Sequence, residues 1–214
     1  MDWLDWHDAY HRPDSSLSQR LRAVQAQIRR TLDGAPAGPV RVLSVCAGQG
    51  HDLLEVLADH PRRGDVKARL VELDARNTAM AAAAAAGLDV EVITGDASLT
   101  DHYRGLAPAD LVLMCGVFGN ITLPDIERTV DACRRLAATG GTVIWTRGRT
   151  APDRVPQICE WFEAKEFDRA WVSEPDVDYG VGVHRYRGEP LPLEENTSMF
   201  RFVGFAELQA AGLT

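Results

Sequence analysis

Apolar residues near the start of the chain recur at helical spacing. Leu17, Leu21 and Ile28 follow this period, which is typical of one buried face of an amphipathic helix. Pro13 interrupts the pattern, because a proline inside a helix removes a hydrogen bond and clashes with the preceding turn. The pattern therefore predicts two helices between Trp3 and Leu32.

From residue 40 onward, short apolar runs alternate with stretches of helical period. We expect strands at Arg41–Cys46, Ala68–Asp74, Val90–Thr94, Leu111–Cys115 and Thr142–Thr146, and helices at His51–His60, Ala75–Gly87, Asp125–Ala138 and Asp153–Glu166. A strand, a helix and a second strand in succession form a right-handed crossover between parallel strands. The alternation therefore predicts a mostly parallel sheet with helices on both faces.

The end of the chain has a different pattern. Ala170–Ser173, Val181–Tyr186 and Met199–Phe205 are expected to be strands with no helices between them, which indicates antiparallel pairing. The predicted fold is a doubly wound α/β sheet with an antiparallel C-terminal edge. We expect one domain, with residues 1–39 as an N-terminal helical cap and residues 40–214 as the core.

Composition and charge narrow the functional classes. The 214 residues include 23 Lys+Arg and 31 Asp+Glu, for a net charge of −8, which argues against a protein that binds nucleic acid mainly by neutralising phosphates. The longest apolar stretch is residues 79–86, far short of the ~20 residues that a membrane span needs. Four widely spaced cysteines and no visible signal peptide indicate reduced thiols, no zinc site and a cytoplasmic location.

A glycine-containing turn follows the first strand of the expected sheet. Ser44 begins a segment in which Gly48 and Gly50 lie between the strand and the next helix. Glycines are needed where a chain bends sharply and lets a ligand contact backbone amides at a helix N-terminus. The nicotinamide-dinucleotide fingerprint requires a third glycine, and Leu53 occupies that place. This substitution weakens the dinucleotide interpretation.

Acidic and small residues follow the next three strands. Asp74 ends the second strand, where a carboxylate can accept hydrogen bonds from both hydroxyls of a ribose. Asp96 ends the third, where it can accept from the exocyclic amine of adenine, and Cys115 and Gly116 end the fourth. Each residue alone is better explained as a helix cap or turn residue. Their occurrence in order at the carboxyl ends of successive strands favours a nucleoside-binding cleft.

These segments resemble the successive motifs of class I S-adenosylmethionine-dependent methyltransferases. The resemblance spans residues 40–146 and rests on residues 44–50, 73–74, 95–97 and 110–117. It implies a seven-stranded, Rossmann-like sheet with S-adenosylmethionine across the carboxyl ends of the first four strands and S-adenosylhomocysteine as product. The cofactor contacts that it implies are Cys46, Ala47, Gly48, Gly50, Asp74, Ala75, Asp96, Ala97, Cys115, Gly116 and Val117.

The sequence departs from the family pattern in the glycine loop. Ser44 stands where the family usually has an acid, and Cys46 where it usually has a glycine. Without that acid, another group must hold the amino end of the cofactor's methionine part. The Tyr10 hydroxyl, together with Arg20 or Arg22, is expected to reach the carboxylate of that part.

The first residues also supply the candidates for catalysis. Trp3, Trp6 and Tyr10 fall at helical spacing and form either a lid over the cleft or a plain packing face. His7 and His11 have the spacing of a zinc-binding helix, but Arg12 and Pro13 end that helix and no third ligand follows, so we expect no metal. Tyr10, His11 and, on a presumed edge strand, His184 are the catalytic candidates.

The predicted function is transfer of a methyl group from S-adenosylmethionine to an N, O or C nucleophile of a small molecule. The chain lacks the Asn/Asp-Pro-Pro-aromatic motif of nucleic-acid amino methyltransferases. Three alternatives remain: a nicotinamide oxidoreductase, a non-catalytic adenosylmethionine-binding module, and a tRNA or protein methyltransferase. The last would dock through the arginine pairs at positions 29–30, 62–63 and 134–135. The acceptor and the oligomeric state are not specified by the sequence.

Overall fold

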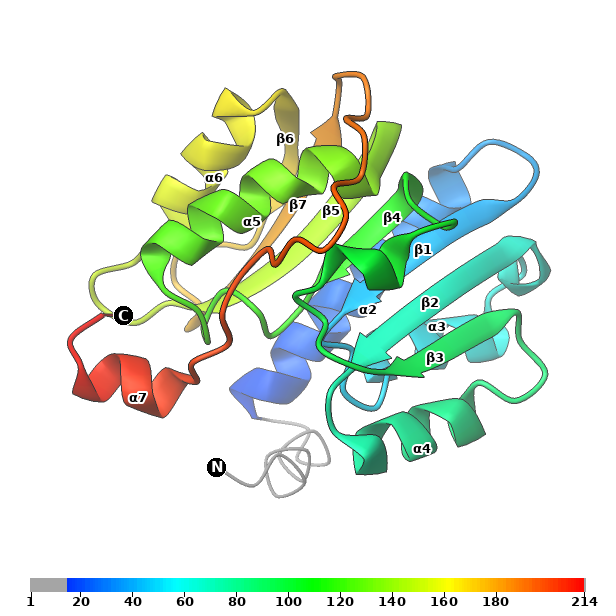
Figure 1. Cartoon of the computed structure of the whole chain (residues 1–214), viewed down its shortest axis with the longest axis horizontal. Coiled ribbons are helices and arrows are strands. Elements are labelled where there is room, and N and C mark those ends of the chain that lie inside the picture. The colour runs from blue at the N-terminus through cyan, green and yellow to red at the C-terminus, as the bar shows by residue number, and fades with distance from the viewer. Residues whose placement is uncertain (1–14, 214) are drawn as a thin grey trace.

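A seven-stranded sheet forms the centre of the protein, seen in a computed structural model that describes residues 15–213 (Figure 1). The strand order is β3-β2-β1-β4-β5-β7-β6, parallel except that β7 is antiparallel to both β5 and β6. The strands are β1 (Val40–Val45), β2 (Val66–Glu72), β3 (Val90–Thr94), β4 (Ala109–Met114), β5 (Ala137–Gly148), β6 (Phe167–Val172) and β7 (Tyr179–Tyr186). The predicted doubly wound sheet with an antiparallel edge is confirmed.

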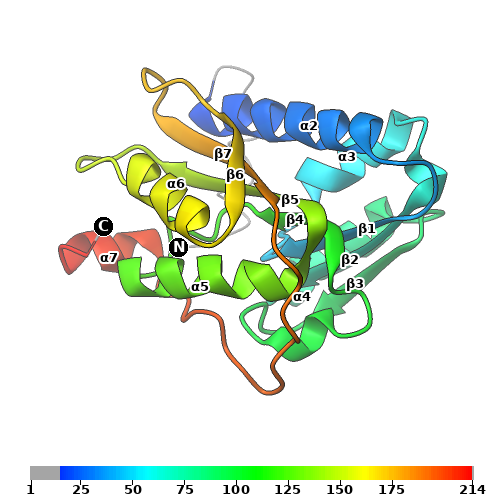
Figure 2. The ribbon, with the colours of Figure 1, turned by 90° about the horizontal axis from the view of Figure 1, so that it is seen from above.

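Helices cover both faces of the sheet (Figure 2). The helices of one face are α2 (Ser16–Gly34), α3 (His51–Asp59) and α4 (Ala75–Ala84), and those of the other are α5 (Leu123–Leu136) and α6 (Val155–Ala164). Short helical segments are η2 (Arg63–Asp65), η3 (Thr100–Tyr103) and α7 (Phe205–Ala210). Two apolar cores result, one on each side of the sheet.

Helix α2 is part of the core of the molecule. Its residues Val24, Ile28 and Leu32 are 0–2% exposed and belong to the same apolar cluster as the residues of α3, β5 and β7. The helix starts where the Ser15 side chain accepts a hydrogen bond of 3.1 Å from the backbone amide of Ser18, as N-cap residues do. The first of the two predicted N-terminal helices lies outside the described residues.

The predicted strand at Met199–Phe205 is wrong. After β7 the chain runs as residues 187–204, here named the C-terminal strap, across α5 toward the loops that follow β3 and β4 (Figure 1). It bonds to these loops through the amides of Met199, which donates to Ser98, and Val203, which donates to Asn120, both at 2.9 Å. Since its partners are loops, no strand forms at these residues, and an isolated bridge of Ser198 with Leu99 lies just before them.

Two element boundaries differ from expectation in a way that affects the site. Strand β2 ends at Glu72, two residues before the predicted end, because Asp74 is the N-cap of α4. Strand β5 begins at Ala137, directly after α5, and not after the glycines at 140–141. Because of the first difference, the carboxylate at the end of β2 is that of Glu72, and Asp74 belongs to the start of α4.

Residues 15–213 contain neither a candidate membrane span nor a candidate metal cluster. None of the helices there combines the length and apolar character that crossing a membrane requires. No cluster of three or more His, Cys, Asp or Glu side chains in this part of the chain is arranged to hold a metal ion. His7 and His11, which have zinc-like spacing, lie outside the described residues.

Candidate functional site

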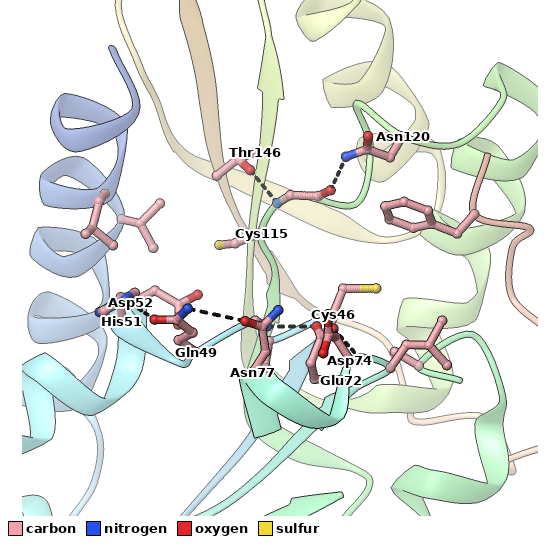
Figure 3. A pocket seen from close by; sticks show the side chains of 18 of the residues that line it. Cys46, Gln49, His51, Asp52, Glu72, Asp74, Asn77, Cys115, Asn120 and Thr146 are labelled. Atoms are coloured by element: carbon pink, nitrogen blue, oxygen red, sulfur yellow. Dashed lines mark hydrogen bonds between the residues drawn. The ribbon is translucent and has the colours of Figure 1, made fainter. Parts of the chain in front are cut away.

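A cavity of about 430 Å³ opens at the carboxyl ends of the central strands. Clefts at this end of an open α/β sheet are where such folds bind ligands. The lining comes from the N-terminal parts of α2, α3 and α4, the ends of β2 and β5, the loops after β1, β2, β3 and β4, and the C-terminal strap (Figure 3). The lining residues are Arg20, Leu21, Val24, Cys46, Ala47, Gly48, Gln49, His51, Asp52, Glu72, Leu73, Asp74, Asn77, Asp96, Ala97, Cys115, Gly116, Asn120, Thr146, Phe200 and Phe202.

The loop between β1 and α3 turns sharply through left-handed backbone conformations. Cys46, Gly48 and Gly50 have φ values of 53°, 55° and 76°. For a residue with a side chain such as Cys46 this conformation costs roughly 1–2 kcal/mol. A Cβ atom at Gly50 would lie 2.7 Å from Leu54 and 2.9 Å from Leu70, so this glycine permits the packing of α3 on β2. Gly48 is the glycine that lines the cavity.

Glu72, at the end of β2, is the carboxylate held against the glycine loop. Its Oε2 accepts a hydrogen bond from the Gly48 amide, and its Oε1 accepts one from the Asp74 amide, each at 2.9 Å. Two backbone donors therefore fix the orientation of this side chain at the cavity wall. Remaining lone pairs on both oxygens are available to further donors.

Asp74, which the sequence predicts as the acceptor for the ribose hydroxyls, is the N-cap of α4. Its Oδ1 accepts from the Arg76 amide at 2.8 Å, and its Oδ2 accepts from the Arg76 guanidinium at 2.6 Å. These hydrogen bonds from Arg76 lower the pKa of Asp74 to about 2. Asp74 lies at the rim of the cavity, but as the cap of α4 its carboxylate is already engaged by Arg76.

The loop after β3 forms the next part of the wall. Asp96 is oriented by a hydrogen bond of 2.9 Å that its Oδ1 accepts from the Ser98 amide. Ala97 follows it, and its carbonyl accepts a 2.6 Å hydrogen bond from the buried hydroxyl of Tyr103. Phe200 of the C-terminal strap lines the same cavity. This region offers one carboxylate among apolar surfaces.

The loop after β4 is fixed from two sides (Figure 3). The Gly116 amide donates to the Thr146 hydroxyl at 2.8 Å, and its carbonyl accepts from the Asn120 side-chain amide at 2.7 Å. The Oδ1 of Asn120 also accepts a 2.9 Å bond from the Phe205 amide, directly after the strap. Asn120 thus connects the strap to the β4 loop.

Several polar side chains lie on the α2 and α3 side of the cavity (Figure 3). Asp52, in the first turn of α3, accepts a 2.8 Å hydrogen bond from the Leu53 amide. Burial raises the pKa of Asp52, and the hydrogen bonds from Leu53 and Cys115 partly oppose this shift. Gln49 donates from its side-chain amide to Asn77 at 3.2 Å.

The two thiols of the cavity do not approach each other. Cys46 and Cys115 end neighbouring strands, but their sulfur atoms point in opposite directions (Figure 3), and they pack against different apolar cores. Burial raises the pKa of both thiols well above the usual value. Both cysteines are free, and their thiols are protonated at neutral pH.

The structure gathers most of the predicted contacts around one cavity. Those that line it are Arg20, Cys46, Ala47, Gly48, Asp74, Asp96, Ala97, Cys115 and Gly116. Gly50, Ala75 and Val117 are not among the lining residues. Val117 is completely buried in the core beneath α5. Tyr10 and His11 lie outside the described residues, as do Trp3 and Trp6.

His184 is in the interior, and it does not line the cavity. Its ring is 0% exposed and is stacked on Phe162 of α6 with the ring centres 4.6 Å apart. Its Nδ1 accepts a 3.0 Å hydrogen bond from the indole Nε1 of Trp145. Burial lowers the pKa of His184 to about 3. Because α6 covers β7, the structure places this catalytic candidate in the interior and away from the cavity.

Several lining residues were missed by the sequence interpretation. They are Leu21, Val24, Gln49, His51, Asp52, Glu72, Leu73, Asn77, Asn120, Thr146, Phe200 and Phe202. For Glu72 a signal existed, because Asp74 before Ala75 has the form of a helix cap and places the strand end two residues earlier. No sequence signal marked Phe200 and Phe202, since the path of the strap depends on tertiary contacts.

Comparison with known proteins gives one family match. A family described as a methyltransferase domain matches residues 42–141, which contain the glycine loop, Glu72, Asp96 and the β4 loop. The matched region is a little less than half of the chain.

Solved methyltransferases share the fold of this domain. The CurJ carbon methyltransferase is 15% identical with a TM-score of 0.68, over 85% of this chain and 58% of that chain. The 1,6-didemethyltoxoflavin-N1-methyltransferase of Burkholderia thailandensis, with 1,6-didemethyltoxoflavin and S-adenosylhomocysteine bound, is 18% identical with a TM-score of 0.58, over 86% of each chain. The magnesium protoporphyrin IX methyltransferase of Synechocystis PCC 6803, with S-adenosylmethionine bound, is 13% identical with a TM-score of 0.58, over 78% of this chain and 79% of that chain.

These likenesses establish the fold and leave the acceptor undetermined. The chain spans less than two thirds of the CurJ chain, at 58% of its length. No curated protein sequence matches this chain. Its acceptor therefore has to be inferred from its own cavity.

Proposed function

We propose that the protein transfers the methyl group of S-adenosylmethionine to an N, O or C nucleophile of a small molecule. The observation that carries this proposal is the cavity of about 430 Å³, which has carboxylates at the ends of β2 and β3 and walls supplied by α2 and the C-terminal strap. A site of this size that is bounded on several sides suits a small acceptor better than a large polymer.

The residues of the cavity fit the nucleoside part of the cofactor. We assign the ribose hydroxyls to Glu72, whose two oxygens are already oriented by the backbone amides of the loop, and not to Asp74. Asp96 is placed to accept from the exocyclic amine of adenine. Leu73, which is 70% exposed, and the side chain of Phe200 offer apolar cover for the adenine ring.

The chemistry requires little from side chains once both reactants are held in place. The cofactor supplies an activated methyl group, so the protein acts mainly by orienting the reactants and excluding water. Gly116, Asn120 and Thr146, held to one another by hydrogen bonds, lie beside the region where the acceptor approaches. Arg20 of α2 lines the other side and is assigned to the carboxylate of the methionine part, together with Tyr10.

The tRNA or protein methyltransferase alternative loses its proposed docking surface. Arg29 is paired with Asp59 at 2.6 Å, and Arg62 donates to four backbone carbonyls near the end of α2. Arg134 and Arg135 are both paired with Asp131. Guanidinium groups engaged in this way are less available for phosphates.

The nicotinamide oxidoreductase and the non-catalytic module are each distinguished from a methyltransferase by a different observation. The match to a methyltransferase domain and the antiparallel β7 argue against a nicotinamide oxidoreductase. A non-catalytic adenosylmethionine-binding module would have the same cofactor cavity and would be distinguished by the absence of turnover with any acceptor.

The test combines binding with methyl transfer. Calorimetry should show binding of S-adenosylmethionine and S-adenosylhomocysteine, and none of NAD. Incubation with methyl-labelled S-adenosylmethionine and with separate dialysable, protein and tRNA fractions of a cell extract should place label in the dialysable fraction. Label confined to the protein or tRNA fraction would contradict a small-molecule acceptor, and binding without any transfer would favour the non-catalytic module.

A further inference from the structure

Asp52 is a carboxylate of the cavity wall that pairs with no lysine or arginine among residues 15–213. It lies in the first turn of α3 and lines the cavity, and its Oδ1 accepts a hydrogen bond from the Leu53 amide. Within residues 15–213, no lysine or arginine side chain forms an ion pair with it. The charge of this side chain is therefore only partly compensated by the protein.

The surroundings of Asp52 disfavour its charge in the free protein. Removing a carboxylate from water without a counter-ion is costly, and burial accordingly raises the pKa of Asp52. Few titratable groups face it: the protonated Cys115 thiol from β4 and the His51 ring on its own helix, with Arg20 of α2 acting on that same thiol. A ligand that brings a positive charge to this position would relieve the cost.

Asp52 is placed to supply the negative charge that is absent at Ser44. Ser44 occupies the place of the acid usual in this family, and it is 1% exposed. It pairs with Leu113 of the parallel strand β4, and Leu113 and Cys115 face the core beneath α2 and α3. Since Cys115 lies against Asp52, Asp52 is on the face of the sheet toward which the missing acid would point.

We propose that the Asp52 carboxylate is the counter-ion of the α-ammonium group of S-adenosylmethionine and replaces the acid that is absent at Ser44. This assignment rests on the proposed function of the cavity. It pairs with the assignment of Arg20, because the amino-acid end of the cofactor carries one positive and one negative charge. Asp52 on α3 and Arg20 on α2 both line the cavity and match these two charges.

The test compares two ligands that differ only at this end. S-adenosylhomocysteine carries the amino-acid group, and 5′-methylthioadenosine has the same adenosine and thioether without it. In calorimetry, Asp52→Asn should weaken S-adenosylhomocysteine by about tenfold to a hundredfold, as expected for a lost charge-assisted hydrogen bond, and leave 5′-methylthioadenosine unchanged. Asp59→Asn, the same substitution on the same helix but outside the cavity, should change neither affinity.

The pH dependence gives a second readout. As the pH falls through the raised pKa of Asp52, the carboxylate becomes protonated and the wild-type affinity for S-adenosylhomocysteine should fall relative to that for 5′-methylthioadenosine. In Asp52→Asn this ratio should not change with pH.

Three outcomes decide between the proposals. Equal weakening of both ligands by Asp52→Asn would show a structural role and would overturn this inference while preserving the proposed function. Unchanged affinity for both ligands would also overturn it. A wild-type protein that binds neither ligand would overturn the proposed function, and this inference with it.

Discussion

The backbone amide of Gly48 donates a hydrogen bond of 2.9 Å to the carboxylate of Glu72. This contact joins the glycine loop after β1 to the end of β2, so the two elements to which we assign the nucleoside are positioned by one another. The strength of such a bond to a charged acceptor exceeds that of a neutral pair. Glu72 is therefore both a ligand-facing group and a support for the loop.

The first prediction separates the two carboxylates after β2. Glu72→Gln should weaken S-adenosylhomocysteine and 5′-methylthioadenosine alike, by about tenfold to a hundredfold, because both ligands carry the ribose. Asp74→Asn should leave both affinities unchanged, since asparagine also caps helices well. Calorimetry on the two variants decides the assignment, and the reverse pattern would restore Asp74 as the ribose ligand.

A second prediction concerns the loop glycine. Gly48 has a φ of 55° and lines the cavity, so Gly48→Val combines backbone strain with obstruction of the ligand and should abolish cofactor binding. Gly64→Ala is the control, because a Cβ there meets nothing within 4 Å. Circular dichroism and calorimetry check the two variants. A folded Gly48→Val protein with normal affinity would exclude this loop from the binding site.

A third prediction tests the connection between the strap and the cavity. Asn120→Ala removes the hydrogen bonds to Gly116 and Phe205, which should lower the free energy of unfolding by roughly 1–3 kcal/mol and weaken cofactor binding. Thr139→Ala removes a strap contact far from the cavity, to the Gly188 carbonyl, and should leave binding unchanged. Equal effects of both variants on affinity would show that the strap does not shape the site.

A fourth prediction uses the buried pair of Trp145 and His184. His184→Phe leaves the Trp145 indole N–H without its acceptor and should lower stability at neutral pH by roughly 1–3 kcal/mol. In the wild type the depressed pKa of His184, about 3, contributes stability that is present at neutral pH and lost as the pH falls from its ordinary value of 6.5 through that pKa. The variant should therefore lose less stability on acidification.

The same variant tests the position of His184 in the interior. Because the residue does not line the cavity, His184→Phe should retain its cofactor affinity and its turnover per folded molecule once an acceptor is known. Denaturant unfolding at several pH values and calorimetry provide the measurements. Loss of turnover without loss of stability would restore His184 as a catalytic candidate.

A fifth prediction addresses the segment before α2. Deletion of residues 1–14 keeps Ser15, the N-cap of α2, so the described core should remain folded. If the aromatic residues of this segment act as a lid, the shortened protein should lose most turnover and some cofactor affinity. If they only pack against the core, the melting temperature should fall while the activity of the folded molecules is unchanged.

The fold was predictable because it is encoded in local patterns. The alternation of apolar runs and helical periods placed β1, α3, β3 and β4 within two residues of their observed bounds, and the helix-free tail indicated the antiparallel edge. Burial of parallel strands on both faces produces these continuous apolar runs. The order of polar residues at the strand ends likewise indicated the cofactor cavity.

The errors arose where tertiary contacts override local pattern. A strand end and a helix cap compete for the same residues around Glu72 and Asp74, and the observed strand is two residues shorter than predicted, because Asp74 caps α4. His184 looked like an edge-strand residue, because nothing local shows that α6 covers β7. Residues 199–205 have the composition of a strand, but the loops that they contact provide no sheet edge to extend.

The C-terminal strap has a consequence for a shortened chain. Its contacts with the β3 loop join residues about a hundred positions apart, such as Ser198 with Ser98, and contacts between residues so distant in sequence form slowly. Every strand of the sheet precedes Phe200 and Phe202 in the sequence. A chain truncated before residue 200 would therefore contain all the strands and still lack two residues of the cavity wall.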